Sequence, residues 1–247
     1  MRNARTADAR ARRDPHDGFV ATTASAPTRT PAEDGIPRLV GRAAVCTGLL
    51  GLALGLWCRS FSEGSSGPLG IGLAQLGAPW VLVAFAAGAL IVDERSGDPV
   101  IERAAVALGG LAGAGTMVVA SFSYYGNASS PSAVFWAAVG LVVGGAAGLA
   151  GAAWRARPGS AVGATAAGAI GLALVAEGIG RLDFGWFDST SQVSHVGARW
   201  LVAAGLALPV LLTRGRPAGV VASISVVLLA APVAALVVVA SYGLGLG

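Results

Sequence analysis

The chain has 247 residues, of which 54% are hydrophobic and only 12% charged. Soluble domains usually carry about 25% charged residues, so this composition points to a protein immersed in lipid. All basic residues are arginine, and the formal net charge is +4. These arginines lie in the N-terminal segment and between apolar runs. The tendency of basic residues to stay on the cytoplasmic side of a membrane therefore explains them without a nucleic-acid partner.

The first 37 residues differ from the rest of the chain. They are rich in Arg, Ala, Thr, Pro and Asp and show no hydrophobic periodicity. We interpret residues 1–37 as a disordered cytoplasmic tail. The first apolar run begins only near Leu39, too far along for the apolar stretch of a cleavable signal peptide. Residues 38–247 then form a transmembrane helical domain.

That domain contains seven apolar runs separated by short polar breaks. A helix needs about 20 mainly apolar residues to cross a bilayer. The sequence therefore predicts an all-α polytopic bundle of about seven spans, with the lipid bilayer as its main partner. The runs are approximately 40–58, 69–92, 104–125, 133–154, 161–180, 193–213 and 219–242.

The arginines in the connections predict the orientation of the bundle. If the tail lies inside, the inner connections hold six arginines and the outer ones three. This asymmetry favours an N-terminus inside and a C-terminus outside, in a multi-pass protein of the cell membrane. The inner set is Arg95, Arg103, Arg155, Arg157, Arg214 and Arg216, and the outer set is Arg59, Arg181 and Arg199.

Proline and cysteine leave alternatives open in the first two runs. Pro79 either kinks a long second helix or occupies the first turn of a shorter helix that starts near Gly77. Cys46 and Cys58 are about 18 Å apart on one helix, so they do not pair with each other. We interpret both cysteines as small apolar packing residues, with an intermolecular bridge through Cys58 as the alternative.

Glycines recur at four-residue spacing on three of the predicted helices. Such stripes let helix backbones come into van der Waals contact. Packing within one chain is the simpler interpretation, and a homo-oligomer interface through the fourth helix is the alternative. The stripes are Gly140, Gly144 and Gly148 on the fourth helix, Gly109 and Gly113 on the third, and Gly51 and Gly55 on the first.

The sequence lacks the residues that several kinds of intramembrane chemistry require. A retinal Schiff base needs a lysine, and the chain has none. Haem and zinc sites in membranes normally use histidine, and only His16 and His195 exist, neither within the predicted hydrocarbon core. No predicted span interior holds an aspartate pair or a serine–histidine pair, and there is no phosphate-binding Gly-Lys-Ser/Thr loop. We therefore predict no catalytic, metal or cofactor site.

One polar cluster remains as a candidate site. Glu177 is the only acidic residue within a predicted span, and Arg181 follows it by one helical turn in the favourable order for an ion pair. His195 and Arg199 open the next span near the same outer mouth. An interfacial ion pair that anchors two helices is the simpler interpretation of this cluster. A proton or ligand pathway is the alternative, because ionisable groups in lipid are costly and often functional.

The stretch from Ala78 to Tyr125 resembles a known family. It contains Ala78-Pro79-Trp80, the apolar run that ends at Phe85, Gly88-Ala89 and Tyr124-Tyr125. In these features it resembles small actinobacterial multi-pass membrane proteins of unknown function. The resemblance implies a membrane location and brings no catalytic residues.

The favoured function is that of a non-enzymatic structural or interaction protein of the membrane. The reason is the combination of many small residues, few polar ones and no catalytic set. A small transporter or channel that uses Glu177, Arg181, His195 and Arg199 is the alternative.

Overall fold

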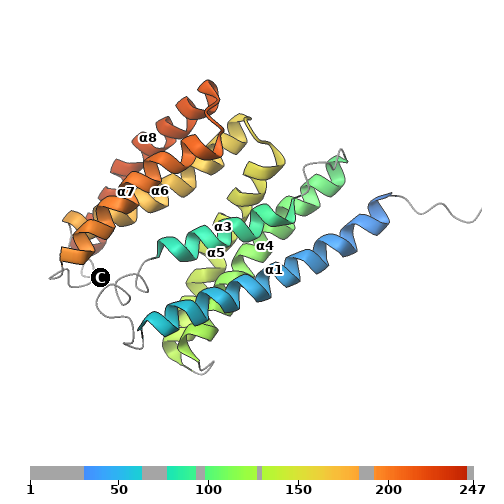
Figure 1. Ribbon diagram of the computed structural model, residues 1–247, viewed down its shortest axis with the longest axis horizontal. Helices are drawn as coiled ribbons and strands as arrows, with labels where there is room; N and C mark the ends of the chain where they lie inside the picture. The colour runs from blue at the N-terminus through green and yellow to red at the C-terminus, as the bar shows by residue number, and fades with distance from the viewer. Residues whose placement is uncertain (1–30, 63–76, 93–97, 127–129, 184–191, 244–247) are drawn as a thin grey trace, which may run out of the picture.

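Every regular element in the described part of the chain is an α-helix. The computed structural model describes residues 31–62, 77–92, 98–126, 130–183 and 192–243 (Figure 1). Within these ranges the predicted all-α class is confirmed. The seven helices are α1 (Pro31–Ser62), α3 (Ala78–Ile91), α4 (Pro99–Tyr125), α5 (Pro131–Ala156), α6 (Ala161–Asp183), α7 (Gln192–Leu212) and α8 (Pro217–Gly243).

Four of these helices contain stretches that are long and apolar enough to cross a membrane. The stretches are Gly35–Ser62, Pro99–Tyr125, Pro131–Ala156 and Ala161–Arg181. Shorter apolar stretches among the described residues are Ala78–Ile91, Val196–Leu212 and Pro217–Ala230. Each of the seven predicted runs therefore overlaps one helix of the structure.

Two helix boundaries differ from the sequence prediction. Helix α1 begins at Pro31, so residues 31–37 belong to this helix rather than to the predicted tail. A proline suits the first helical position, because the N–H that it lacks would have no partner there. Helix α3 begins at Ala78, with Pro79 in its first turn. The described residues therefore agree with the alternative in which Pro79 occupies the first turn of a helix that starts near Gly77. Residues 1–30 and 63–76 lie outside the described part of the chain.

The helices form two groups that meet along α6. Helices α1, α3, α4 and α5 pack together, and α6, α7 and α8 form the second group (Figure 1). Helix α6 contacts α5 and α3 of the first group. An apolar cluster that includes Phe85, Met117 and Ile170 lies where the groups meet, and Trp154, Leu208 and Leu212 pack against it.

Glycines bring the helices of the first group into backbone contact. A Cβ atom at Gly148 would meet the backbone of Gly109 and Gly113 on α4, and one at Gly88 on α3 would meet the backbone of Gly148. A Cβ atom at Gly51 would lie 2.8 Å from the carbonyl oxygen of Thr116. The predicted glycine stripes therefore face helices of the same chain.

The stripe predicted as a homo-oligomer interface packs in the same way. Gly140 and Gly144 face Met117 on α4, and Gly144 also faces the carbonyl oxygen of Gly113. Self-association stays a prediction.

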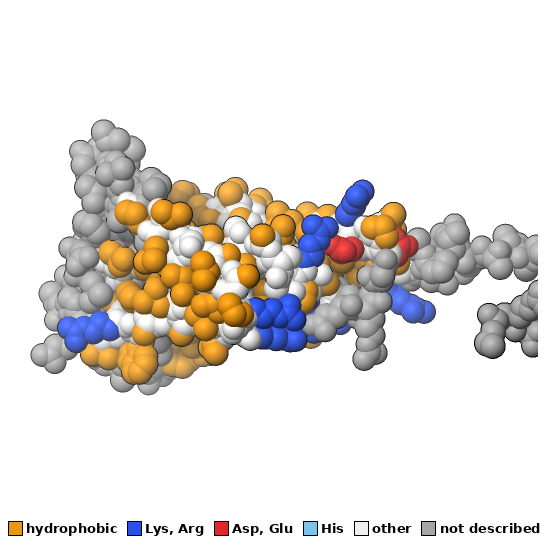
Figure 2. Space-filling view, turned by 90° about the horizontal axis from the view of Figure 1, so that it is seen from above, with side chains coloured by type: hydrophobic (Ala, Val, Ile, Leu, Met, Phe, Trp, Pro, Cys, Tyr) orange, Lys and Arg blue, Asp and Glu red, His pale blue; other side chains and the backbone are white. Residues whose placement is uncertain are grey.

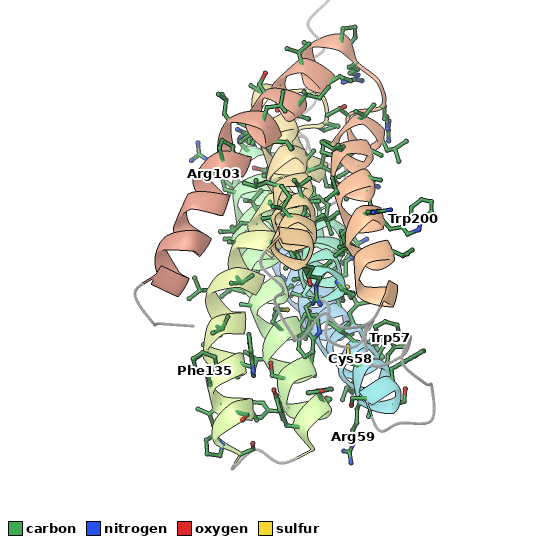
Figure 3. The ribbon with its side chains drawn as sticks, turned by 90° about the vertical axis from the view of Figure 1, so that its left-hand side faces the viewer. Trp57, Cys58, Arg59, Arg103, Phe135 and Trp200 are labelled. Atoms are coloured by element: carbon green, nitrogen blue, oxygen red, sulfur yellow. The ribbon has the colours of Figure 1, made fainter. Side chains whose placement is uncertain are left out.

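The two ends of the bundle carry different side chains. At one end the start of α1 meets the start of α4, where a Cβ atom at Gly35 would lie 3.2 Å from the side chain of Ile101. In Figure 2, Arg side chains gather toward this end, and Figure 3 shows Arg103 far along the bundle from Arg59, Trp57 and Phe135. We call this the arginine-rich end. Its described arginines are Arg38, Arg42, Arg103, Arg155, Arg157, Arg214 and Arg216.

Candidate functional site

The candidate site lies at the opposite end, where α3 begins. The helix has Gly77 at its N-cap position, which offers no side-chain hydrogen bond to the first turn. The first N–H groups of any helix lack partners inside the helix. Pro79 has no N–H, which leaves those of Gly77, Ala78 and Trp80 without an acceptor inside the helix. The sequence Gly-Ala-Pro thus creates a local demand for an external cap.

Glu177 of α6 supplies this cap from the other helix group. The backbone N–H of Gly77 donates to Oε1 of Glu177 at 2.8 Å, and the backbone N–H of Ala78 donates to Oε2 at 2.6 Å. A carboxylate at a helix N-terminus is also stabilised by the positive end of the helix dipole. Glu177 therefore links the start of α3 to α6 by hydrogen bonds and by charge.

Arg181 completes the arrangement from one turn further along α6. Its Nε and Nη2 atoms donate to Oε1 of Glu177 at 3.1 and 2.8 Å. The Arg181 side chain is only 5% exposed, and that of Glu177 is 14% exposed. A buried charge is costly unless it is paired and hydrogen-bonded, and here each member of the pair satisfies the other.

These contacts define what the carboxylate can do chemically. An ionised carboxylate offers about four acceptor positions, and Glu177 accepts four N–H groups. Three of these bonds end on Oε1 and one on Oε2, so a proton, cation or polar substrate would compete with the bonds from α3 and with the Arg181 charge. This geometry favours a structural tie. We call the arrangement of Glu177, Arg181, Gly77 and Ala78 the carboxylate tie.

The structure brings only part of the predicted cluster into contact. Arg199 on α7 is exposed and makes no hydrogen bond or ion pair with the residues that the structure describes. The backbone of His195 belongs to α7, but its side chain lies outside the described part. A joint role of His195 and Arg199 with Glu177 stays a prediction.

The backbone partners of Glu177 are not predictable from a sequence pattern. Backbone N–H groups carry no sequence signature of their own, so Gly77 and Ala78 were not candidates. The usable signal was a helix start without Ser, Thr, Asp or Asn before the proline. A search for a distant acidic residue to serve this uncapped start would have pointed to Glu177.

The described residues hold no group of three or more His, Cys, Asp or Glu side chains that would bind a metal ion. Both cysteines are free thiols, with Cys58 buried and Cys46 half-buried. Cys58 is in the interior where α1, α3 and α4 meet, close to Trp80 and Tyr124 (Figure 3). This position agrees with the interpretation of Cys58 as a packing residue.

Fold and site together describe a helical bundle with four helices of membrane-spanning length and an internal carboxylate tie. The chain belongs to DUF6518, a family of unknown function, whose model matches residues 36–246. No curated protein and no solved structure matches the chain. The match includes helices of both groups and all four residues of the carboxylate tie. The resemblance to a family of unknown function is therefore confirmed, and the actinobacterial origin stays a prediction.

Proposed function

We propose that this chain is a multi-pass protein of the cell membrane that acts without catalysis, as a packed helical scaffold for other membrane components. The observation that carries the proposal is the set of four N–H groups on the Glu177 carboxylate, which come from the start of α3 and from Arg181. The ionisable residue best placed for transport is engaged by four donors from its own chain. The glycine contacts between α3, α4 and α5 add support, because backbones in van der Waals contact leave no room for a pathway between them.

The proposal includes an orientation with the arginine-rich end in the cytoplasm. Seven arginines lie at this end, against two described acidic side chains, Asp98 and Glu102. Asp98 caps α4 through the N–H of Val100, and Glu102 pairs with Arg157. The excess of positive charge therefore remains, and it favours the cytoplasmic side. The C-terminus is then outside.

Membrane extraction and thiol labelling test location and orientation together. On a cysteine-free background, single cysteines at Pro158 and Ser130 report the two ends, because these positions lie between helices. The protein should stay in the membrane through alkaline carbonate washing. In intact cells, an impermeant maleimide should label the Ser130→Cys variant and spare the Pro158→Cys variant. Release by carbonate would refute the membrane assignment, and the reverse labelling would refute the orientation.

A transporter or channel is the second candidate, favoured by the length of α3. Its 14 residues span about 21 Å, short of the roughly 30 Å hydrocarbon core. Secondary transporters place the N-termini of such short helices at their substrate sites. In that function the Glu177 carboxylate would release Gly77 and Ala78 during each cycle and expose their N–H groups.

A flux assay separates the two candidates. The purified protein is reconstituted in liposomes with an internal pH-sensitive dye, under imposed proton and salt gradients, and compared with the Glu177→Gln variant. The scaffold proposal predicts no flux above empty liposomes for either protein, with both folded and inserted. Flux in the wild type that falls in the variant would overturn it in favour of transport.

A further inference from the structure

Two turns lie against each other at the arginine-rich end. The turn between α5 and α6 runs from Arg157 to Ser160, and the turn between α7 and α8 runs from Thr213 to Arg216. Nη1 of Arg216 donates to the carbonyl oxygen of Pro158 at 3.0 Å, and Nε1 of Trp154 donates to that of Leu212 at 2.9 Å. These two bonds fix the turns side by side. We call their shared surface the paired-turn face.

The paired-turn face concentrates positive charge. Arg157, Arg214 and Arg216 are exposed on it, and the one described carboxylate that engages them is Glu102, 2.8 Å from Nε of Arg157. Arg214 has a left-handed backbone with φ of 54°, followed by Gly215 with φ of 66°. This tight turn places Arg214 and Arg216 at the start of α8.

Helix dipoles add to this positive charge. Helices α6 and α8 both begin at the face, and neither has an acidic residue in its first turn. An arginine side chain has no acceptor, so Arg216 does not cap the free N–H groups of α8. The Ser160 hydroxyl accepts the N–H of Gly163 at 3.1 Å and caps α6 without adding charge, whereas Asp98 and Glu102 bring negative charge to the start of α4 at the same end. Arginines at two helix N-termini repel the dipoles unless an anion lies between them.

The surroundings of the face show which anion fits. Leu211 is 70% exposed one turn before Arg214, and Val162 is 49% exposed just after the α5–α6 turn. Phosphate groups bind guanidinium and helix N-termini well, and acyl chains cover exposed apolar side chains. A phospholipid with an anionic headgroup satisfies both needs at once, whereas a soluble anion leaves the apolar positions uncovered.

We propose that the paired-turn face, through Arg157, Arg214 and Arg216, binds the phosphate headgroup of an anionic lipid of the inner leaflet. The inference rests on the proposed membrane function. It adds a defined lipid site to the general attraction between basic residues and anionic membranes.

Native mass spectrometry tests the site on the full-length protein in detergent. The protein is equilibrated with equal amounts of phosphatidylglycerol and phosphatidylcholine, and bound lipids are counted. Phosphatidylglycerol should dominate, and Arg214→Asn should weaken it about fivefold, since one basic residue near a membrane surface contributes about 1 kcal/mol. Asparagine tolerates the left-handed backbone, so this variant keeps the turn. Arg214→Lys should retain most of the binding.

Arg38→Gln is the matched control. Arg38 is an exposed arginine of the same end, but it lies on α1, which does not pack against α6, α7 or α8. Its loss should leave the bound phosphatidylglycerol unchanged. Equal binding of both lipids, or equal losses for Arg38→Gln and Arg214→Asn, would overturn the proposal. Displacement of the lipid by millimolar inorganic phosphate would assign the face to a soluble anion instead.

Two further measurements keep the test decisive. If Arg214→Asn fails to give a monodisperse protein, Arg157→Gln replaces it, with the same expected loss and the same contradicting result. Carbonate extraction separates this inference from the proposed function. A protein that stays in the membrane but shows no lipid preference refutes the lipid site alone, and a protein that carbonate releases refutes the membrane assignment itself.

Discussion

The carboxylate of Glu177 accepts a hydrogen bond from the backbone N–H of Gly77, 100 residues earlier in the chain, at 2.8 Å. This contact joins the first helix group to the second at the end opposite the arginine-rich one. At the arginine-rich end, Trp154 and Arg216 make the hydrogen bonds from the α5–α6 region to the α7–α8 turn. Polar contacts thus fix the α6–α8 group at both ends, and apolar packing fills the length between them.

Glycine substitutions test the packing of the first group. A Cβ atom at Gly148 would collide with the backbone of α4, and backbone does not move aside as a flexible side chain does. Gly148→Ala should lower the unfolding temperature in detergent clearly, by an overpacking cost of about 1–3 kcal/mol. Gly48→Ala is the control, because nothing lies within 4 Å of the added Cβ atom. Alanine favours helix there, so stability should stay equal or rise. Equal losses at both positions would contradict the close contact of α4 and α5.

The indole of Trp154 gives a second test. Trp154→Phe keeps an aromatic ring beside Phe85 but removes the donor to the carbonyl oxygen of Leu212. We expect a loss of about 1 kcal/mol in the free energy of unfolding, the usual net value of one hydrogen bond. Trp200→Phe is the control, since Trp200 is 72% exposed. Denaturation in a graded SDS series measures the stability of both variants. Identical midpoints would show that the hydrogen bond from Trp154 to Leu212 contributes nothing to stability.

Most of the fold follows from the sequence, because apolar run length and polar breaks are local properties. The runs over 104–125, 133–154 and 161–180 match α4, α5 and α6 to within a few residues. The second run left two helix starts open for a clear reason. Hydropathy alone does not register that Pro79 suits a helix start better than a helix interior, and residues 69–76 lie outside the described part of the chain.

Only the part of the candidate site that lies within one helix could be predicted from the sequence. Glu177 and Arg181 are one turn apart on a single helix, so sequence spacing alone suggests their ion pair. The bonds from Gly77 and Ala78 depend on how α3 meets α6, which is a tertiary relationship without a local pattern. In the same way, glycine spacing predicted close packing on α5 but did not identify α4 of the same chain as its partner.

Thiol chemistry tests the position of Cys58. Its side chain is fully buried, whereas Cys46 is half-buried. In the folded protein, a maleimide should label Cys58 far more slowly than Cys46, and both should react fully once SDS unfolds the chain. Single-cysteine variants and mass spectrometry give the two rates separately. A dimer linked through Cys58 on a non-reducing gel would contradict the burial of Cys58 and support the alternative of an intermolecular bridge.

The carboxylate tie makes a quantitative prediction about coupling between its members. Breaking a buried, hydrogen-bonded ion pair by removing one partner costs about 3–5 kcal/mol, because the other charge is left unpaired. Glu177→Gln and Arg181→Gln should each destabilise the protein strongly, and the double variant should lose less than the two losses combined. The exposed pair Glu102–Arg157 is the matched control, with an expected coupling of about 0.2–1 kcal/mol.

A double-mutant cycle on Glu177 and Arg181, with unfolding followed in detergent, tests this most directly. A coupling energy of about 1–3 kcal/mol, well above that of Glu102 and Arg157, is the result that a structural tie between the helix groups predicts. Losses that simply add, or single variants as stable as the wild type, would contradict it and leave the Glu177 carboxylate free to serve a pathway.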